Sequence, residues 1–273
     1  MFVNIKDLFM PKQKTISAKA VIEYWEGQAN KHPKIDEEQL SHINGQTNQA
    51  RFFYSKTYNI AYRPTPKCAS TSIKSVFFQI HYHKPFNPRD MNSPDIHKYF
   101  LANYKQVEVN PENSFAFAVA RDPIKRFISG YRNRVLHHEN IKKLLDIDGQ
   151  KYKPPLLSDF ALSLPGFIKI SVSVAHHMSL QKLILGDNLQ KYSQIFKIEE
   201  LSDLMAELMK RTKLAVELPR EQNYGPLFQL SGLSDDAFEY LLDFYKQDYD
   251  LLANQYTLES IKSEYFSQKN RFK

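Results

Sequence analysis

The apolar positions of the chain change spacing from segment to segment, and these changes predict alternating strands and helices. The stretch FFYSKTYNIAYRP is rich in β-branched and aromatic residues and predicts a strand around residues 57–63. The run SFAFAVAR (114–121) is almost continuously apolar, which is typical of a buried parallel strand. A helix between them is predicted by apolar residues that recur at intervals of three and four, namely Ile73, Val76, Phe77 and Ile80.

Helical spacing dominates the rest of the chain. Asp122 and Pro123 suit the cap and first turn of a helix. Its apolar stripe would be Ile124, Phe127, Ile128, Tyr131 and Val135. Further helices are predicted near 97–105, around the stripe Leu201, Leu204, Met205 and Leu208, and from Ser234 onward, whereas FIKISVSV (167–174) alternates like a strand. The order of strand, helix, long connection, strand and helix predicts an α/β fold with a central parallel sheet flanked by helices.

Polarity along the chain suggests three regions. Residues 1–50 are polar around one amphipathic piece, AKAVIEYWEG, and are expected to form a helical extension. Residues 51–260 would form the main domain, and residues 261–273 a basic C-terminal tail. There is no apolar run of the roughly eighteen residues that a membrane span needs. The N-terminus does not resemble a signal peptide, so a soluble, cytoplasmic protein is expected.

Charge and cysteine content narrow the class of partner. The formal net charge of +7 favours an anionic partner. A single cysteine, Cys68, excludes a disulfide within the chain and argues against a cysteine-based metal site. The cluster His137-His138-Glu139 lacks the spacing of a helical zinc site, so no metal is predicted.

The stretch PTPKCASTSIK (64–74) lies between the first predicted strand and the following helix. The first N–H groups of a helix are unpaired and attract anions. Lys67 adds a mobile positive charge, and the hydroxyls that could assist it belong to Ser70, Thr71 and Ser72. The spelling differs from the G-x-x-x-x-G-K-[ST] motif of nucleotide hydrolases, because the lysine precedes the hydroxyls and no glycine is present. An ordinary surface loop followed by a capped helix would have a similar sequence, so that alternative stays open.

A second cationic stretch, ARDPIKRFISGYRNR (120–134), follows the second predicted strand. The guanidinium of Arg121 and the hydroxyl of Ser129 could both donate hydrogen bonds to a terminal phosphate. The arginines at 126, 132 and 134 keep the surroundings positive, although a solvated helix face is the simpler interpretation for the last two. Gly130 inside the helix indicates a close backbone approach. Two anion sites on neighbouring strands would suit a ligand with two separated phosphate-like groups.

These two stretches resemble the nucleotide motifs of sulfotransferases that use 3′-phosphoadenosine 5′-phosphosulfate (PAPS). PKCASTSIK looks like their 5′-phosphosulfate loop, and FAVARDPIKRFISGYRNR looks like their 3′-phosphate motif. The residues of the two motifs most resemble those of carbohydrate sulfotransferases of the heparan 2-O and chondroitin/dermatan/HNK-1 type. The resemblance covers about residues 55–255, with weaker blocks downstream. Ala69 stands where many members have glycine, and the membrane anchor of Golgi members is absent, which points to a bacterial-style cytoplasmic enzyme.

The resemblance implies a P-loop-like, three-layer fold and a metal-independent transfer of a sulfuryl group from PAPS to a hydroxyl, leaving the bisphosphate PAP. Lys67 would stabilise charge on the leaving phosphate. Arg121 and Ser129 would bind the 3′-phosphate. The 5′ end of the donor would be held by the loop residues Lys67, Cys68, Ala69, Ser70, Thr71 and Ser72.

The reaction also implies a general base and an acceptor. His97, in SPDIHKYFL, best matches the position of the family's base, and the alternatives in the same segment are His81, His83, Asp90 and Asp95. The acceptor expected from the family is a carbohydrate, and the basic residues favour an acidic glycan or lipopolysaccharide rather than nucleic acid. Two other functions stay open: a P-loop kinase or hydrolase, and a non-catalytic basic module that binds nucleic acid or an anionic polymer.

Overall fold

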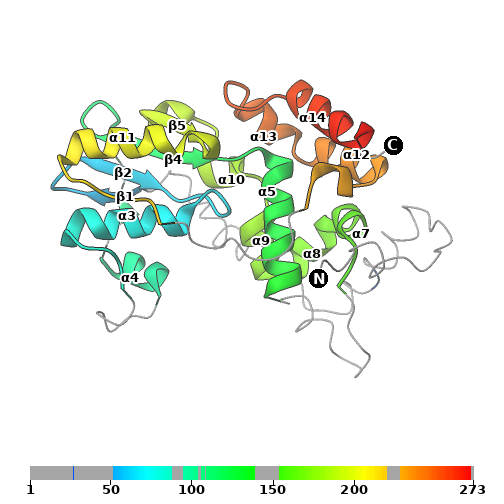
Figure 1. Cartoon of the computed structure of the whole chain (residues 1–273), viewed down its shortest axis with the longest axis horizontal. Coiled ribbons are helices and arrows are strands. Elements are labelled where there is room, and N and C mark those ends of the chain that lie inside the picture. The colour runs from blue at the N-terminus through cyan, green and yellow to red at the C-terminus, as the bar shows by residue number, and fades with distance from the viewer. Residues whose placement is uncertain are drawn as a thin grey trace.

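A computed structural model describes residue 27 and residues 52–87, 95–103, 106–107, 109–138, 154–219 and 228–271. The expected helical extension at residues 1–50 lies outside these described residues, except for Gly27. Within the described chain, a sheet with its covering helices forms one half of the molecule and a helical bundle forms the other (Figure 1).

The sheet contains five strands in the order β3-β1-β2-β4-β5. They are β1 (Phe52–Ser55), β2 (Ile60–Arg63), β3 (Gln106–Val107), β4 (Phe115–Ala120) and β5 (Gln194–Lys197). The strands β2, β4 and β5 are parallel, but β1 pairs antiparallel with both of its neighbours. The sheet is therefore mixed, and the expectation of a parallel sheet is correct only for its β2-β4-β5 part. The strand expected at 57–63 is shorter, because residues 56–59 form the turn between β1 and β2.

The alternation FAFAVA in β4 gives the sheet one face of large side chains and one of small ones. Phe115, Phe117 and Val119 pack in the same hydrophobic cluster as three helices, α3 (Ser70–Tyr82), α4 (Ile96–Asn103) and α11 (Leu201–Thr212). The alanines of β4 lie on the other face. There they pack near Leu185 of α10 (Lys182–Leu185) and Leu252, which follows α13 (Lys246–Leu251). Helical segments therefore cover both faces, as an α/β fold requires.

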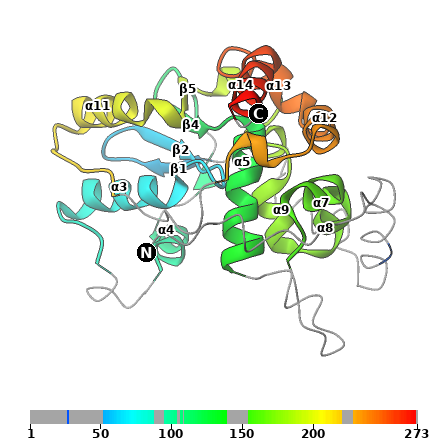
Figure 2. The same ribbon diagram turned by 45° about the vertical axis from the view of Figure 1, so that its right-hand side comes forward.

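Helix α5 (Pro123–Gly130) carries the chain from the end of β4 into the helical half (Figures 1 and 2). The side chain of Asp122 accepts the N–H groups of Ile124 and Lys125, both at 3.0 Å, which confirms the expected cap. The helix continues as a π-helix, η3 (Tyr131–His137). The predicted apolar stripe of this helix is buried throughout, at Ile124, Phe127, Ile128, Tyr131 and Val135.

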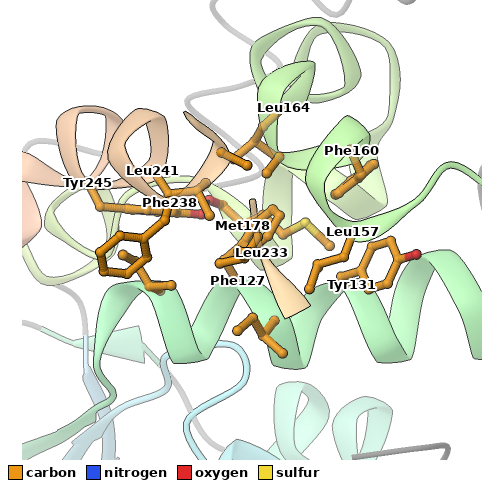
Figure 3. Packing of buried hydrophobic residues seen from close by; sticks show 14 of the residues in the cluster. Phe127, Tyr131, Leu157, Phe160, Leu164, Met178, Leu233, Phe238, Leu241 and Tyr245 are labelled. Atoms are coloured by element: carbon orange, nitrogen blue, oxygen red, sulfur yellow. The ribbon is translucent and has the colours of Figure 1, made fainter. Parts of the chain in front are cut away.

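The stripe packs against the remaining helices, and Figure 3 shows Phe127 and Tyr131 among side chains from several of them. The α-helices of this half are α7 (Leu157–Leu162), α8 (Leu164–Ile170), α9 (Val172–Met178), α12 (Asp235–Phe244), α13 and α14 (Leu258–Asn270). Short 3₁₀ turns are η4 (Leu189–Lys191), η5 (Ile198–Glu200) and η6 (Leu230–Gly232). A Cβ atom on Gly130 would lie 2.9 Å from Met178 Cγ and Cε, which confirms the close approach expected at this glycine.

Two expectations fail in this half of the molecule. The segment 167–174 is not a strand: it ends α8 and begins α9, with the side chain of Ser171 capping α9. Its buried apolar residues, Phe167, Ile170 and Val174, are three and four positions apart, so the same residues also fit a helix. The expected tail boundary at residue 260 falls inside α14. Ile261 and Tyr265 of that helix are buried in the core, and their burial ties the helix to the domain.

Candidate active site

The two cationic stretches lie at the same edge of the sheet. Strands β2 and β4 are parallel neighbours, with Arg63 opposite Ala118. The loop of residues 64–69 follows β2, and Arg121 follows β4. The carboxyl ends of parallel strands share one edge, where open α/β sheets bind their ligands. A guanidinium N–H of Arg121 donates to the carbonyl oxygen of Lys67 at 3.4 Å, so the two stretches are in contact.

The loop after β2 has an unusual backbone for a segment without glycine. Lys67 and Ala69 have left-handed φ angles of 67° and 56°. Each such residue costs about 1 kcal/mol relative to a right-handed conformation. The left-handed Ala69 immediately precedes α3, and no side chain caps that helix end. The loop therefore turns sharply into a helix whose first N–H groups can donate hydrogen bonds to an anion.

Positive charges converge on Lys67. Its pKa is lowered to about 8, first by burial and then by the charges of Arg134, Arg121 and Arg132. Lys67 comes from the loop after β2, Arg121 from the end of β4, and Arg132 and Arg134 from η3. Like charges held together in a partly buried site repel one another, and a bound anion would relieve that repulsion.

Arg121 and Arg134 each have an unsatisfied donor. The Nε atoms of Arg121 and Arg134 are buried and have no hydrogen-bond partner within the described part of the chain. Buried donors are nearly always paired in native proteins. Their presence beside Lys67 is therefore consistent with a site that receives its acceptor oxygens from a ligand.

Arg134 is held in place by His177 rather than exposed on a solvated helix face, so the simpler interpretation of this arginine is wrong. Its guanidinium lies 2.6 Å from His177 Nε2, and His177 Nδ1 lies 2.8 Å from the carbonyl oxygen of Ser173. A carbonyl only accepts and a guanidinium only donates, so the imidazole proton is on Nδ1. Burial and the Arg134 charge hold the pKa of His177 well below its ordinary value, which keeps it neutral.

Arg126 is the one arginine of the stretch 120–134 that is fully buried within the described residues. Its guanidinium donates to the carbonyl oxygens of His177, at 2.8 Å, and Ser179. The backbone around α9 therefore occupies two of its nitrogens. Arg126 therefore stabilises the backbone around the site, and these two guanidinium nitrogens are not available to a ligand.

Gln181 connects the loop, the end of β4 and the C-terminal helices. Its Oε1 accepts from the Arg121 backbone at 3.2 Å and from Cys68 Sγ at 3.5 Å, and its Nε2 donates to the Arg121 carbonyl at 2.8 Å. Its own backbone N–H donates to the carboxylate of Asp248 in α13 at 2.8 Å. Burial raises the pKa of the Cys68 thiol to about 12, so Cys68 is a structural part of the loop and not a nucleophile.

His97, in the first turn of α4, reaches the loop from the other side. Its Nε2 lies 3.2 Å from Thr71 Oγ1, its Nδ1 lies 2.8 Å from Lys74 Nζ, and its backbone N–H donates to Asp95 at 2.8 Å. Burial and the Lys74 charge lower its pKa to about 4. The alternatives His81 and His83 lie at the exposed end of α3, and Asp90 lies outside the described residues.

The sequence-predicted residues are thus largely brought together. Hydrogen bonds join Arg121 to Lys67 directly and to Cys68 through Gln181. A separate contact joins His97 to Thr71, which lies in the first turn of α3 with Ser70 and Ser72, just after Ala69. Ser129 is half-buried in the last turn of α5, and among the described residues no hydrogen bond joins it to Arg121. The sequence did not single out Lys74 or Gln181. The one feature that could have identified them is that each is a polar residue at a position that is buried in the fold.

Comparison with known proteins agrees with this arrangement. Residues 50–256 match the model of the sulfotransferase family, a span that contains both cationic stretches and all five strands. Neither a curated protein nor a solved structure shows significant similarity to the chain. Within the described ranges there is no group of three or more His, Cys, Asp or Glu side chains placed to hold a metal ion. In the same ranges, every helix is too short or too polar to cross a membrane.

Proposed function

This chain belongs to the sulfotransferase family, and we propose that it moves a sulfuryl group from PAPS to a hydroxyl of a carbohydrate acceptor by in-line displacement. The observation that carries the proposal is the convergence of Lys67, Arg121 and Arg134 at the ends of two neighbouring parallel strands. A donor with a sulfated 5′-phosphate and a separate 3′-phosphate supplies the two anionic groups that such a site needs.

The loop after β2 binds the 5′ end of the donor in this proposal. The first N–H groups of α3 and the hydroxyls of Ser70, Thr71 and Ser72 donate to the phosphosulfate oxygens. A P-loop-like, three-layer arrangement is supported by the order of β2, loop and α3 and by the helices on both faces of the sheet. Lys67 stands at the start of this loop, where its ammonium stabilises negative charge on the leaving phosphate.

The 3′-phosphate is bound at the end of β4. Arg121 supplies a guanidinium whose buried Nε is free to donate. Ser129 lies two turns along α5 and offers a hydroxyl to the same group or to a neighbouring oxygen. These contacts fix the position of the nucleotide and take no part in breaking the S–O bond.

His97 is the proposed general base for the acceptor hydroxyl. The contact between its Nε2 and Thr71 places the imidazole beside the loop that would hold the sulfuryl group. A base must be within hydrogen-bond reach of the proton that it removes, and an acceptor between His97 and the loop meets that condition. Asp95 binds the backbone of His97 and orients α4, so we assign it a supporting role.

Thermal-shift measurements with three ligands separate the proposed function from its rivals. We expect PAP to stabilise the protein and ATP with Mg²⁺ or a DNA oligomer to leave it unchanged, since a ligand stabilises only a fold that binds it. Stabilisation by ATP with Mg²⁺ alone would favour a kinase or hydrolase, and by DNA alone a nucleic-acid-binding module. Arg121→Ala should weaken PAP binding by about 10- to 100-fold. The matched control Lys125→Ala, in the first turn of the helix that follows Arg121 and paired with Glu264, should not.

Transfer itself is tested with radiolabelled PAPS and a panel of glycans and lipopolysaccharides. Lys67→Ala should abolish labelling of the acceptor while leaving the protein folded. Full activity in that variant would refute the role of Lys67. Labelling of a member of this panel tests the carbohydrate acceptor, and cell fractionation tests the proposed cytoplasmic location.

A further inference from the structure

Lys74 is a buried lysine in α3 that the proposed reaction leaves without a role. It is 8% exposed, and its Nζ lies 2.8 Å from His97 Nδ1 and 5.5 Å from the centre of the Phe100 ring. Lysine is almost never buried unless its charge is compensated. Here its hydrogen-bond partner is a neutral imidazole, and the opposing charge is Asp95. Burial lowers the pKa of Lys74 to about 8, so the neutral amine is more populated near neutral pH than in an exposed lysine, although the ammonium still predominates.

The position of Lys74 determines which nitrogen of His97 carries the proton. An ammonium group only donates, so while Lys74 is charged it occupies the lone pair of Nδ1. The single imidazole proton is then on Nε2, where it donates to Thr71 Oγ1. In this state the nitrogen that faces the loop has no lone pair. His97 therefore cannot take a proton from an acceptor hydroxyl while Lys74 is protonated.

We propose that Lys74 acts through His97 as the second member of a proton relay, and that its neutral amine is the final acceptor of the proton from the substrate hydroxyl. The inference rests on the proposed function, because it assigns a proton path to that reaction. Lys74 is a positioning residue in the resting site, since it sets the tautomer of the imidazole that touches the substrate.

The relay balances in atoms and charge. With Lys74 neutral, His97 carries its proton on Nδ1 and donates it to Nζ, so Nε2 has a free lone pair. The O–H bond of the acceptor breaks as Nε2 takes its proton, and the Nδ1 proton moves to Nζ to form an ammonium. The oxygen electron pair forms the new O–S bond. The S–O bond to the 5′-phosphate breaks, and its electrons leave with PAP.

The charges around the pair support this direction of proton flow. The charged and titratable groups that act on His97 come from several elements: Lys74 of α3, Asp95 beside α4, Arg134 of η3 and His176 of α9. Burial and the charges of Lys74, Arg134 and His176 lower the pKa of His97 to about 4, and Asp95 opposes that shift. This pKa is too low for a base that must hold a proton near neutral pH. Burial lowers the pKa of Lys74 to about 8, and Asp95 opposes that shift. The amine is thus the stronger base of the two.

Nitrogen NMR of the wild-type protein, with ¹⁵N in its histidine rings, tests the relay without any acceptor. The His97 signals are assigned by their loss in His97→Asn. We expect the proton on Nε2 below about pH 8 and on Nδ1 above it, because Lys74 stops donating as it loses its charge. A tautomer that stays the same from pH 6 to pH 10 would overturn the proposal.

Two variants identify Lys74 as the cause of the change. Lys74→Arg keeps a donor that does not lose its proton, so His97 should keep its proton on Nε2 from pH 6 to pH 10. Lys74→Met removes the donor and the charge, so the tautomer change near pH 8 should vanish and the pKa of His97 should move toward its ordinary value of about 6.5. A wild-type tautomer change in Lys74→Arg would assign it to another group and refute the relay.

PAP binding separates a failure of this inference from a failure of the proposed function. Lys74→Arg should bind PAP with wild-type affinity and unfold at a temperature close to that of the wild type. If the wild type does not bind PAP, the proposed function fails and the relay fails with it. If the wild type binds PAP but the tautomer of His97 does not follow Lys74, the relay alone is wrong.

Discussion

Gln181 and Arg121 exchange two hydrogen bonds across the site. The side-chain amide of Gln181 donates to the Arg121 carbonyl at 2.8 Å, and the Arg121 N–H donates back to the amide oxygen at 3.2 Å. The same oxygen accepts from Cys68 in the loop after β2. A residue sixty positions beyond Arg121 therefore holds the two proposed phosphate sites at a fixed separation, and its side chain is fully buried.

Replacing Gln181 should impair ligands that span both sites more than ligands that use one. Gln181→Met keeps the volume and removes the hydrogen bonds. We expect calorimetry to show a loss of PAP affinity of roughly tenfold or more, because two linked groups bind tightly only when their sites are correctly spaced. Adenosine 3′-phosphate and adenosine 5′-phosphate should each lose less than about threefold. Gln190→Met, at an exposed glutamine, is the control. Equal losses for all three nucleotides would contradict a spacing role.

Binding of PAP should weaken as the pH rises above about 8. Only the protonated form of Lys67 attracts the 5′-phosphate, and its pKa in the ligand-free protein is about 8. Affinity should be level near pH 7 and then fall by up to about tenfold per pH unit, until the pH exceeds the raised pKa of the complex. Calorimetry between pH 7 and 9.5 measures this. Lys67→Arg should flatten the decline, because arginine keeps its charge. An affinity of the wild type that does not change over this range would rule out a contact between Lys67 and PAP.

Gly130→Ala should destabilise the protein through one contact. Its new methyl group would lie 2.9 Å from Met178 Cγ, so α5 and α9 must separate or Met178 must change rotamer. Overpacking of this kind lowers the free energy of unfolding by about 1–3 kcal/mol. Urea denaturation of Gly130→Ala, Met178→Ala and the double variant gives the coupling. The double variant should be more stable than the sum of the two single effects, and strict additivity would show that the contact is not limiting.

Substitution by glycine should have opposite effects at two exposed lysines, one inside α11 and one that caps its C-terminal end. Lys213 caps the helix with a left-handed φ of 60°, so Lys213→Gly should raise the free energy of unfolding by about 1 kcal/mol. Lys210 is inside the helix, so Lys210→Gly should lower it by about 1 kcal/mol. Chemical denaturation of both variants measures the difference. A loss of stability at Lys213 would mean that its side chain contributes more than its backbone conformation costs.

Local patterns made several elements predictable. The buried strand at 115–120, the helix at 70–82 and the Asp122 cap depend on residues within about eight positions of one another, and the structure confirms all three. The strand expected at 167–174 failed because Phe167, Ile170 and Val174 fit both a strand and a helix. Burial against α5 and α7 decides between them, and no short window contains that information.

The sequence by itself determined that a lysine loop and an arginine would follow two strands, since strand, turn and cap preferences are properties of neighbouring residues. Only the tertiary structure decided which distant side chains complete the site. Gln181 meets Cys68 across 113 positions, Arg134 meets His177 across 43, and Lys74 meets His97 across 23. Such pairs form because a buried polar group without a partner costs free energy, and the identity of the partner depends on how the strands and helices pack.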